Sequence, residues 1–411
     1  MTSQTERGEV DPQTAPRERL WTRTFALVWL NQFLSYASNW ITLPVLPLFL
    51  ARQGQSESYI GLVLAAFSIT SFTARPFFGQ QIDRGRGRGA LAGSSACLSL
   101  AALGYLVPNA PVLFLSRAVH GLGWAGINAV GSGWVAVLAP ARRRAEAIAY
   151  YTTAQAGTVV FGPVLGLAIA RQFGDESAFA VAGAVAILAV LAILGARQAA
   201  EAHHAEQYGQ KHLTGGWWST LIERSAVPAT ILLGVLNVVG PASVAYMPLY
   251  FLKQGLEHPD FYFLAQGLTG VLGRAGVGRL GDRLGRKRMI GVGILVQFGG
   301  FVLLAAANSL ETIILAGSIV TLGNAVREPS FYALVIDRAE PARRGAALAT
   351  YTMGFQIGSG IGSALWGNVI QYFGYTTMYV SCLVPLAASL VMLAVMFRER
   401  PQPRPIEDPI R

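Results

Sequence analysis

The stretch "GVGRLGDRLGRKR", residues Gly276 to Arg288, places a dense cluster of charge between two long apolar runs. A second stretch of the same kind, "RPFFGQQIDRGRGR", residues Arg75 to Arg88, stands 199 residues earlier. At an offset of 200, residues 143–174 and 343–374 are identical at ten positions. A repeat on this scale predicts a tandem duplication, with the polar segment 197–225 joining its two copies.

The composition indicates a membrane protein. Hydrophobic residues make up 53% of the 411 residues and charged residues only 13%, whereas soluble domains carry roughly 25% charged residues. Twelve apolar runs are each long enough to cross a bilayer as a helix. We therefore expect an all-α polytopic protein with twelve transmembrane helices in two parallel six-helix repeats. The expected parts are an N-terminal tail (1–20), an N-terminal bundle (21–196), a central loop (197–225), a C-terminal bundle (226–397) and a C-terminal tail (398–411).

The basic residues predict the orientation of the chain in the membrane. With the N-terminus inside, 25 of the 32 Lys and Arg residues fall on inside segments and three on outside connections. Cytoplasmic loops carry such an excess of positive charge, so we expect a cell-membrane protein with both termini and the central loop in the cytoplasm. The distribution leaves no free basic surface for nucleic acid.

Several chemistries lack the residues they need. Cys97 and Cys382 stand alone in separate apolar runs, so we expect neither a disulfide nor a metal site. The histidines of the central loop have no recognised ligand spacing, and no phosphate-binding Gly-Lys-Ser/Thr loop is present. We therefore expect no cofactor, no catalytic residue and no direct use of ATP.

Three motifs give the chain a family resemblance. "GRLGDRLGRKR" resembles the loop signature of the major facilitator superfamily, "RAVHGLG" (117–123) its fourth-span motif, and "TVVFGPVLGL" (158–167) its antiporter motif. The first loop copy departs from the signature at Arg86, and Thr158 and Leu167 stand where the antiporter motif has Gly. The resemblance implies the major facilitator fold, with a cytoplasmic gate motif at Gly79, Asp83, Arg84, Gly278, Asp282, Arg283, Gly285, Arg286 and Asp337, and an antiporter-like motif at Gly162, Pro163 and Gly166.

The gate motif suits a latch between helices. Its glycines permit tight turns, and its carboxylates can accept hydrogen bonds from a helix N-terminus. The resemblance implies that Asp83 meets the start of span eleven near Arg343 when the inside is closed, and that Asp282 meets the start of span five, with Asp337 joining it. The alternative is that these loops only anchor the topology.

The resemblance also places spans one, four, seven and ten around a central cavity. Polar and aromatic stripes on these spans would then line it, and the candidate substrate residues are Gln32, Tyr36, Asn39, Trp40, Arg117, His120, Trp124, Asn128, Asn237 and Asn324. The alternatives are packing for the aromatic residues and a hydrogen-bonded core position for His120. For Arg75 and Arg274, near the span ends, we expect contact with headgroups or the latch.

Glu328 is the one acidic residue well inside a span, and intramembrane charges are costly enough to suggest function. We expect it to be the proton-coupling residue, with Arg117 nearby. The alternative is a static ion pair with an arginine of the cavity.

These observations predict a secondary transporter that works by alternating access. Proton-coupled efflux of a small organic compound, by antiport, is the first reading, and proton-coupled uptake is the second. A membrane enzyme or a receptor would need catalytic clusters or a soluble domain that the sequence does not show. The expected partners are the small-molecule substrate, protons and membrane lipid, and we expect a monomer.

Overall fold

The computed structural model describes residues 20–140, 143–196, 222–340 and 343–397, excluding the side chains of 82–83, 136–137, 145 and 276–283. This part of the chain is helical throughout and contains no strand. The N-terminal half contains α1 (Arg23–Arg52), α2 (Glu57–Asp83), α3 (Gly87–Gly104), α4 (Ala110–Leu138), α5 (Arg144–Phe173) and α6 (Asp175–Leu194). The C-terminal half contains a short 3₁₀ turn (Arg224–Ala226), α9 (Val227–Asn237), α10 (Gly240–Val244), α11 (Met247–Gln254), α12 (Pro259–Leu284), α13 (Arg286–Ala306), α14 (Leu310–Arg338), α15 (Arg344–Ser381) and α16 (Leu383–Met396).

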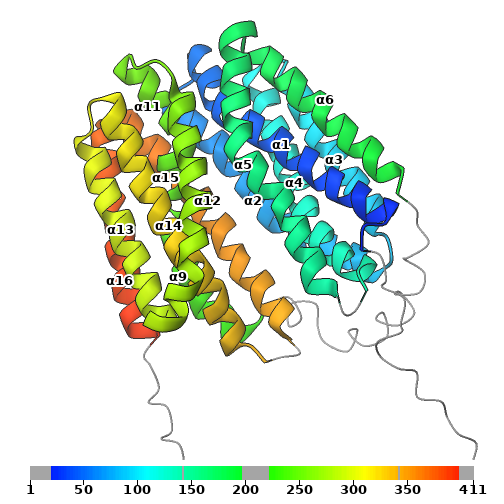
Figure 1. The fold of residues 1–411 in the computed structure, drawn as a ribbon. Coiled ribbons are helices and arrows are strands. Elements are labelled where there is room, and N and C mark those ends of the chain that lie inside the picture. Colours follow the sequence, from blue (N-terminus) through cyan, green and yellow to red (C-terminus); the bar gives the residue numbers. More distant parts are fainter. Residues whose placement is uncertain (1–19, 141–142, 197–221, 341–342, 398–411) are drawn as a thin grey trace, which may run out of the picture.

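The described helices make the twelve predicted passes (Figure 1). Three short helices, α9 to α11, together form one pass, which breaks where Pro241 and Pro248 cannot donate a backbone hydrogen bond. The last two passes run on from each other through α15 and α16. Eight helical segments are long and apolar enough to cross a membrane, and two of them merge several helices. The predicted fold class, an all-α protein with two six-helix repeats, is confirmed.

Glycines at matched positions make the sharpest turns of the two halves. Gly174 (φ 90°) alone separates α5 from α6, and Gly374 (φ 82°) makes the corresponding turn inside α15. Gly85 (φ 66°) and Gly285 (φ 86°) turn the chain after α2 and α12. Such left-handed backbone favours glycine because a Cβ would clash there. The expectation of tight turns in the gate motif therefore holds at Gly285, whereas Gly79 lies inside α2 and not at a turn.

Small residues let α5 pack closely on α1. A Cβ on Gly162 would lie 2.4 Å from Cβ of Trp40, and one on Gly166 would lie 2.2 Å from the Ile41 carbonyl oxygen. Close packing over small residues is the usual basis of helix association in membranes. The antiporter-like motif is thus the surface on which α5 meets α1, and Pro163 lies within the same helix.

The two halves touch at one face and separate at the other. We call the face with the turns at residues 84–86 and 285 the motif face, and the face with residues 53–56 and 255–258 the opposite face. Toward the opposite face, α2 packs along α15 and α5 along α12 (Figure 1). The Glu57 backbone N–H donates to Gln371 Oε1 (2.9 Å), and Arg171 of α5 reaches Asp260 Oδ1 (3.4 Å) and His258 Nδ1 (2.7 Å) of the other half.

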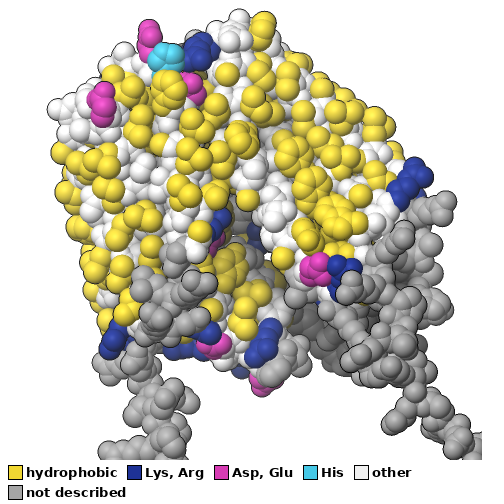
Figure 2. Space-filling view, in the orientation of Figure 1, with side chains coloured by type: hydrophobic (Ala, Val, Ile, Leu, Met, Phe, Trp, Pro, Cys, Tyr) yellow, Lys and Arg dark blue, Asp and Glu magenta, His cyan; other side chains and the backbone are white. Residues whose placement is uncertain are grey.

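The apolar core has the same asymmetry. One buried cluster extends through the C-terminal half and includes residues of the N-terminal half toward the opposite face, such as Val45 and Ile60. A second cluster, which includes Val28, lies in the N-terminal half alone. Figure 2 shows a hollow between the halves below the shared core, with acidic and basic side chains on its walls. We call this hollow the central cleft.

Candidate functional site

An ion pair stands on the wall of the central cleft. Arg274 Nη2 of α12 lies 2.7 Å from Glu328 Oε2 of α14, and 55% and 35% of these side chains are exposed. Tyr332, one turn after Glu328, is close enough to both charges to interact electrostatically. An ionisable residue within a membrane span is by default a candidate for function. The pair is therefore the chemical centre of the candidate site.

The expected partner of Glu328 was wrong. Arg117 is 3% exposed and lies inside the N-terminal half, with its guanidinium 4.3 Å from the centre of the Phe67 ring. It stands seven residues into α4, whereas Glu328 stands 18 residues into α14. At 1.5 Å per residue these positions are about 10 Å and about 27 Å from the helix starts at the opposite face. The difference in depth prevents an Arg117–Glu328 pair.

His120 shares the buried environment of Arg117. It is fully buried, and its Nδ1 lies 3.1 Å from the Tyr105 hydroxyl, while Nε2 has no hydrogen-bond partner. This position matches the alternative of a hydrogen-bonded core histidine. The structure thus brings Arg117 and His120 together with Tyr105 rather than with the central cleft.

The N-terminal half contributes an aromatic and amide group. The Tyr36 hydroxyl donates to Asn128 Oδ1 (2.6 Å), and the Tyr36 ring lies 4.4 Å from that of Trp124. Gln32 accepts a hydrogen bond from the buried Tyr151 hydroxyl of α5. Three of the predicted cavity residues, Tyr36, Trp124 and Asn128, therefore form one group, while Gln32 is committed to packing between α1 and α5.

Other predicted residues of these spans are placed apart from this group. Asn39 is 5% exposed, and its Oδ1 lacks a partner, as does Trp40 Nε1. Asn237 donates to the Leu233 carbonyl oxygen of its own helix and is 7% exposed. Asn324, by contrast, is exposed and stands one turn before Glu328.

Arg75 joins the two halves at the top of the central cleft. Its Nη1 donates to Thr352 Oγ1 of α15 (2.9 Å), and its charge lies close to the hydroxyls of Tyr36 and Tyr332. Nε is buried without a partner, and no carboxylate within the described residues lies within ion-pair distance. Sequence reasoning assigned Arg75 and Arg274 to headgroups or the latch, but both side chains turn toward the cleft. Their matched positions in the repeat were the available signal.

The two halves differ at the position that Glu328 occupies in the C-terminal half. Helices α4 and α14 begin and end 200 residues apart, so that Asn128 occupies the place of Glu328. Arg75 and Arg274 are likewise matched, at the offset of the loop motif. The C-terminal half therefore has a neutralised arginine, whereas the N-terminal half has an arginine and an amide. The central cleft contains one more positive charge than negative charge among these groups.

The gate motif is placed in part. Arg286 Nη1 of α13 pairs with Asp337 Oδ2 of α14 inside the C-terminal half. Arg343 Nε pairs with Glu223 Oε2 (2.8 Å), also within that half. Arg84, just after α2, is exposed and contacts Gln80 of that helix. Gly278 lies within α12, and the side chains of Asp83, Asp282 and Arg283 lie outside the described residues.

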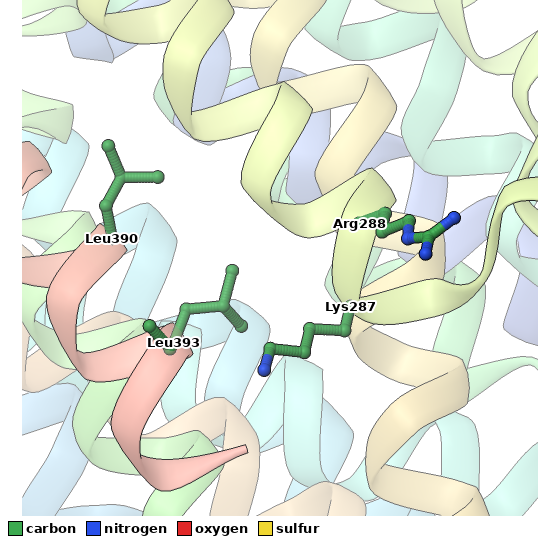
Figure 3. A pocket seen from close by; sticks show the side chains of 5 residues that line it. Lys287, Arg288, Leu390 and Leu393 are labelled. Carbon is green, nitrogen blue, oxygen red and sulfur yellow. The ribbon is translucent and has the colours of Figure 1, made fainter. Parts of the chain in front are cut away.

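A groove on the C-terminal half suits lipid better than substrate. It has a volume of ≈ 320 Å³ and is lined by Lys287, Arg288, Leu390, Leu393 and Ala394, at the motif-face ends of α13 and α16. In Figure 3 the Lys287 side chain points toward Leu393, while Arg288 points away. A cation beside apolar side chains is the surface that an anionic lipid headgroup and its chain require. The groove is not part of the central cleft.

The described residues form no metal-binding cluster and no disulfide. No group of three His, Cys, Asp or Glu side chains converges there. Cys97 and Cys382 are both free thiols.

Comparison with known proteins shows the family to which the chain belongs. The model of the Major Facilitator Superfamily matches residues 28–280 and 260–411. The multi-drug resistance efflux pump PmrA of Streptococcus pneumoniae is 22% identical over 389 residues, which cover 92% of this chain and 97% of that protein. A structure of a nucleoside transporter, NupG, superposes with a TM-score of 0.75 at 13% identity, covering 91% of this chain and 100% of the other. A D-xylose-proton symporter gives a TM-score of 0.71 at 18% identity, covering 90% and 96%. At these identities the solved structures show a common fold.

Proposed function

Because the chain belongs to the Major Facilitator Superfamily, and is thus a multi-pass membrane transporter rather than an enzyme, we propose that it exports a small organic compound, driven by protons. The two halves would rock about the central cleft by alternating access. Export is supported by relatives such as PmrA and MdtG of Dickeya zeae, which are named as multidrug efflux or resistance proteins. The identities, 22% in both cases, support the direction but do not name a substrate.

The observation that carries proton coupling is the Arg274–Glu328 ion pair. A proton on Glu328 would neutralise the carboxylate and release Arg274 from it, so proton binding changes the charge that the cleft offers a substrate. It also frees α12 from α14 at this point, because the 2.7 Å contact links these two helices. Protonation is thereby linked both to the substrate site and to the helices around it.

The test is Glu328→Gln, which keeps the size of the side chain and mimics its protonated state. We expect the variant to retain substrate binding and downhill exchange in proteoliposomes but to lose accumulation driven by an imposed pH gradient. Asn324→Asp, one turn away on the same helix, is the matched control for a local change of charge. If Glu328→Gln accumulates substrate as well as the unmodified protein does, the coupling residue is not Glu328.

Uptake is the second candidate, and Arg75 favours it. The cleft has an excess positive charge, so a negatively charged substrate and a proton would each strengthen the binding of the other. Such cooperativity carries the two in the same direction, and a proton gradient directed inward would then drive uptake. The same vesicles decide between the candidates, because imposing the gradient moves substrate against the protons in the first and with them in the second.

We propose that the motif face is cytoplasmic. The described basic residues of that face, such as Arg84, Arg286 and Arg343, outnumber those of the opposite face, Arg52, Arg171 and Lys253. The cleft then opens to the cytoplasm, where a substrate for export would be loaded. The groove at Lys287 would face the cytoplasmic leaflet, whose anionic lipids complement its charge.

A further inference from the structure

We propose that the central cleft selects organic anions, with Arg75 as the residue that binds the anionic group. The inference rests on the proposed function only in taking the cleft as the substrate site. It does not depend on the direction of transport or on proton coupling.

Arg75 has the properties of a residue that binds an anion. A guanidinium offers five N–H donors in a planar fork that fits a carboxylate, and its charge is permanent. Here a single bond to Thr352 occupies Nη1, and Nε is buried without a partner. Arginines inside membrane proteins are normally paired, because an uncompensated charge at this depth is costly. Because no described carboxylate pairs with Arg75, the partner that would compensate its charge is an anion from outside the protein.

The duplication shows that the missing carboxylate is specific to this position. In the C-terminal half, Arg274 is neutralised by Glu328. In the N-terminal half the matched position contains Asn128, whose Oδ1 is already taken by the Tyr36 hydroxyl. A substrate anion would complete in the first half the ion pair that the protein itself completes in the second.

The surroundings of Arg75 fit the rest of such a molecule. The hydroxyls of Tyr36 and Tyr332 lie close to the charge of Arg75, and the Tyr36 ring packs on that of Trp124. Flat aromatic side chains beside a cation favour a substrate with an aromatic or apolar body and one acidic group. Aryl carboxylates and sulfonates have this chemistry.

Protonation of Glu328 would strengthen the site. The charged and titratable groups that face Glu328 are Arg274 of α12, Tyr332 of its own helix and Tyr351 of α15, with Arg327 adjacent but turned to Gln297. Removing the carboxylate charge leaves Arg274 free as a second cation for the anion. Glu328→Gln, which removes the carboxylate charge, should therefore raise the affinity for an anion.

The test is equilibrium binding by calorimetry to the purified full-length protein, with three probes of one shape. These are 2-naphthoate, the neutral 2-naphthamide and the cationic 2-naphthylmethylamine. We expect 2-naphthoate to bind at least about tenfold more tightly than the amide, and the amine to bind most weakly. Arg75→Gln should remove this preference, and Arg75→Lys should keep part of it.

Asn128→Asp provides the sharper variant, because it supplies the absent carboxylate while leaving Arg75 in place. It should lower 2-naphthoate affinity by about tenfold with little effect on the amide. Glu328→Gln should bind 2-naphthoate more tightly than the unmodified protein does. Equal affinities for the three probes would overturn the proposal, as would an unchanged anion preference in Arg75→Gln. The absence of binding by benzoate, 2-naphthoate and p-toluenesulfonate at millimolar concentration would also count against it. A failed transport assay would leave these binding results intact and would reject the proposed function instead.

Discussion

At the scale of single residues, two glycines of α5 set how closely this helix packs on α1. Gly162 leaves no room for a side chain against Trp40, and Gly166 approaches the Ile41 backbone even more closely. Neither neighbour can move easily, because the Gly162 contact is with the Cβ of a large side chain, Trp40, and the Gly166 contact is with backbone. The α1–α5 contact therefore depends on these two glycines, whereas Gly157 of the same helix has open space around it.

Gly162→Ala should consequently destabilise the protein. Overpacking of a close contact costs about 1–3 kcal/mol, so we expect a lower melting temperature in detergent. Gly157→Ala is the matched control and should be neutral or slightly stabilising, since alanine favours the helix. Equal melting temperatures for the two variants would show that α1 and α5 can separate without cost.

At the scale of helices, the junction of α5 with α12 holds the opposite face closed. Arg171 bridges to His258 and Asp260 across the two halves. A similar pair, Arg52 with Asp175 (2.5 Å), joins α1 to α6 within one half. Only the first pair has to break when the halves part at this face.

Asp260→Asn should favour the state that is open at the opposite face. A partly exposed ion pair contributes about 0.2–1 kcal/mol, which corresponds to a change in population of roughly 1.4-fold to fivefold. Spin labels at Phe173→Cys and Phe261→Cys, in a background without Cys97 and Cys382, would report the distance between α5 and α12 by pulsed EPR. Asp175→Asn, which breaks the pair inside one half, should leave that distance distribution unchanged. A shift with Asp175→Asn alone would contradict the assignment.

Helix positions could be predicted from the sequence, but helix rotations could not. The thickness of the hydrocarbon core sets the length of each pass, and this constraint is local enough to read from apolar runs. The partner of Glu328 depends instead on how α12 and α14 turn toward each other over 54 residues of sequence. From the sequence we expected Arg117 near Glu328 and assigned Arg274 to headgroups or the latch, whereas the structure pairs Glu328 with Arg274.

At the scale of the whole molecule, the duplication explains both the successes and the failures of prediction. Two copies with an even number of passes must lie parallel, which settled the architecture. The substrate site that we propose, however, lies where the copies differ, at Asn128 and Glu328. A repeat predicts what its copies share, so the asymmetry of the cleft required the structure.

Orientation can be checked for the whole molecule with two positions. Glu257→Cys on the opposite face, where the native side chain is 91% exposed, should react with a membrane-impermeant maleimide on intact cells. Arg84→Cys on the motif face should react only after permeabilisation. Both tests use the background without Cys97 and Cys382, and the reverse pattern would place the motif face outside.

The single-glycine turns at Gly174 and Gly374 have a practical consequence. Each joins two membrane passes with no loop between them. At these points the opposite face therefore has no exposed loop that an antibody could bind or a protease could cleave. An epitope tag inserted at either glycine would have to replace a left-handed turn with a loop and would force the paired helices apart. The longer connections on this face, such as residues 105–109 between α3 and α4, are where a tag or a cleavage site can be accommodated.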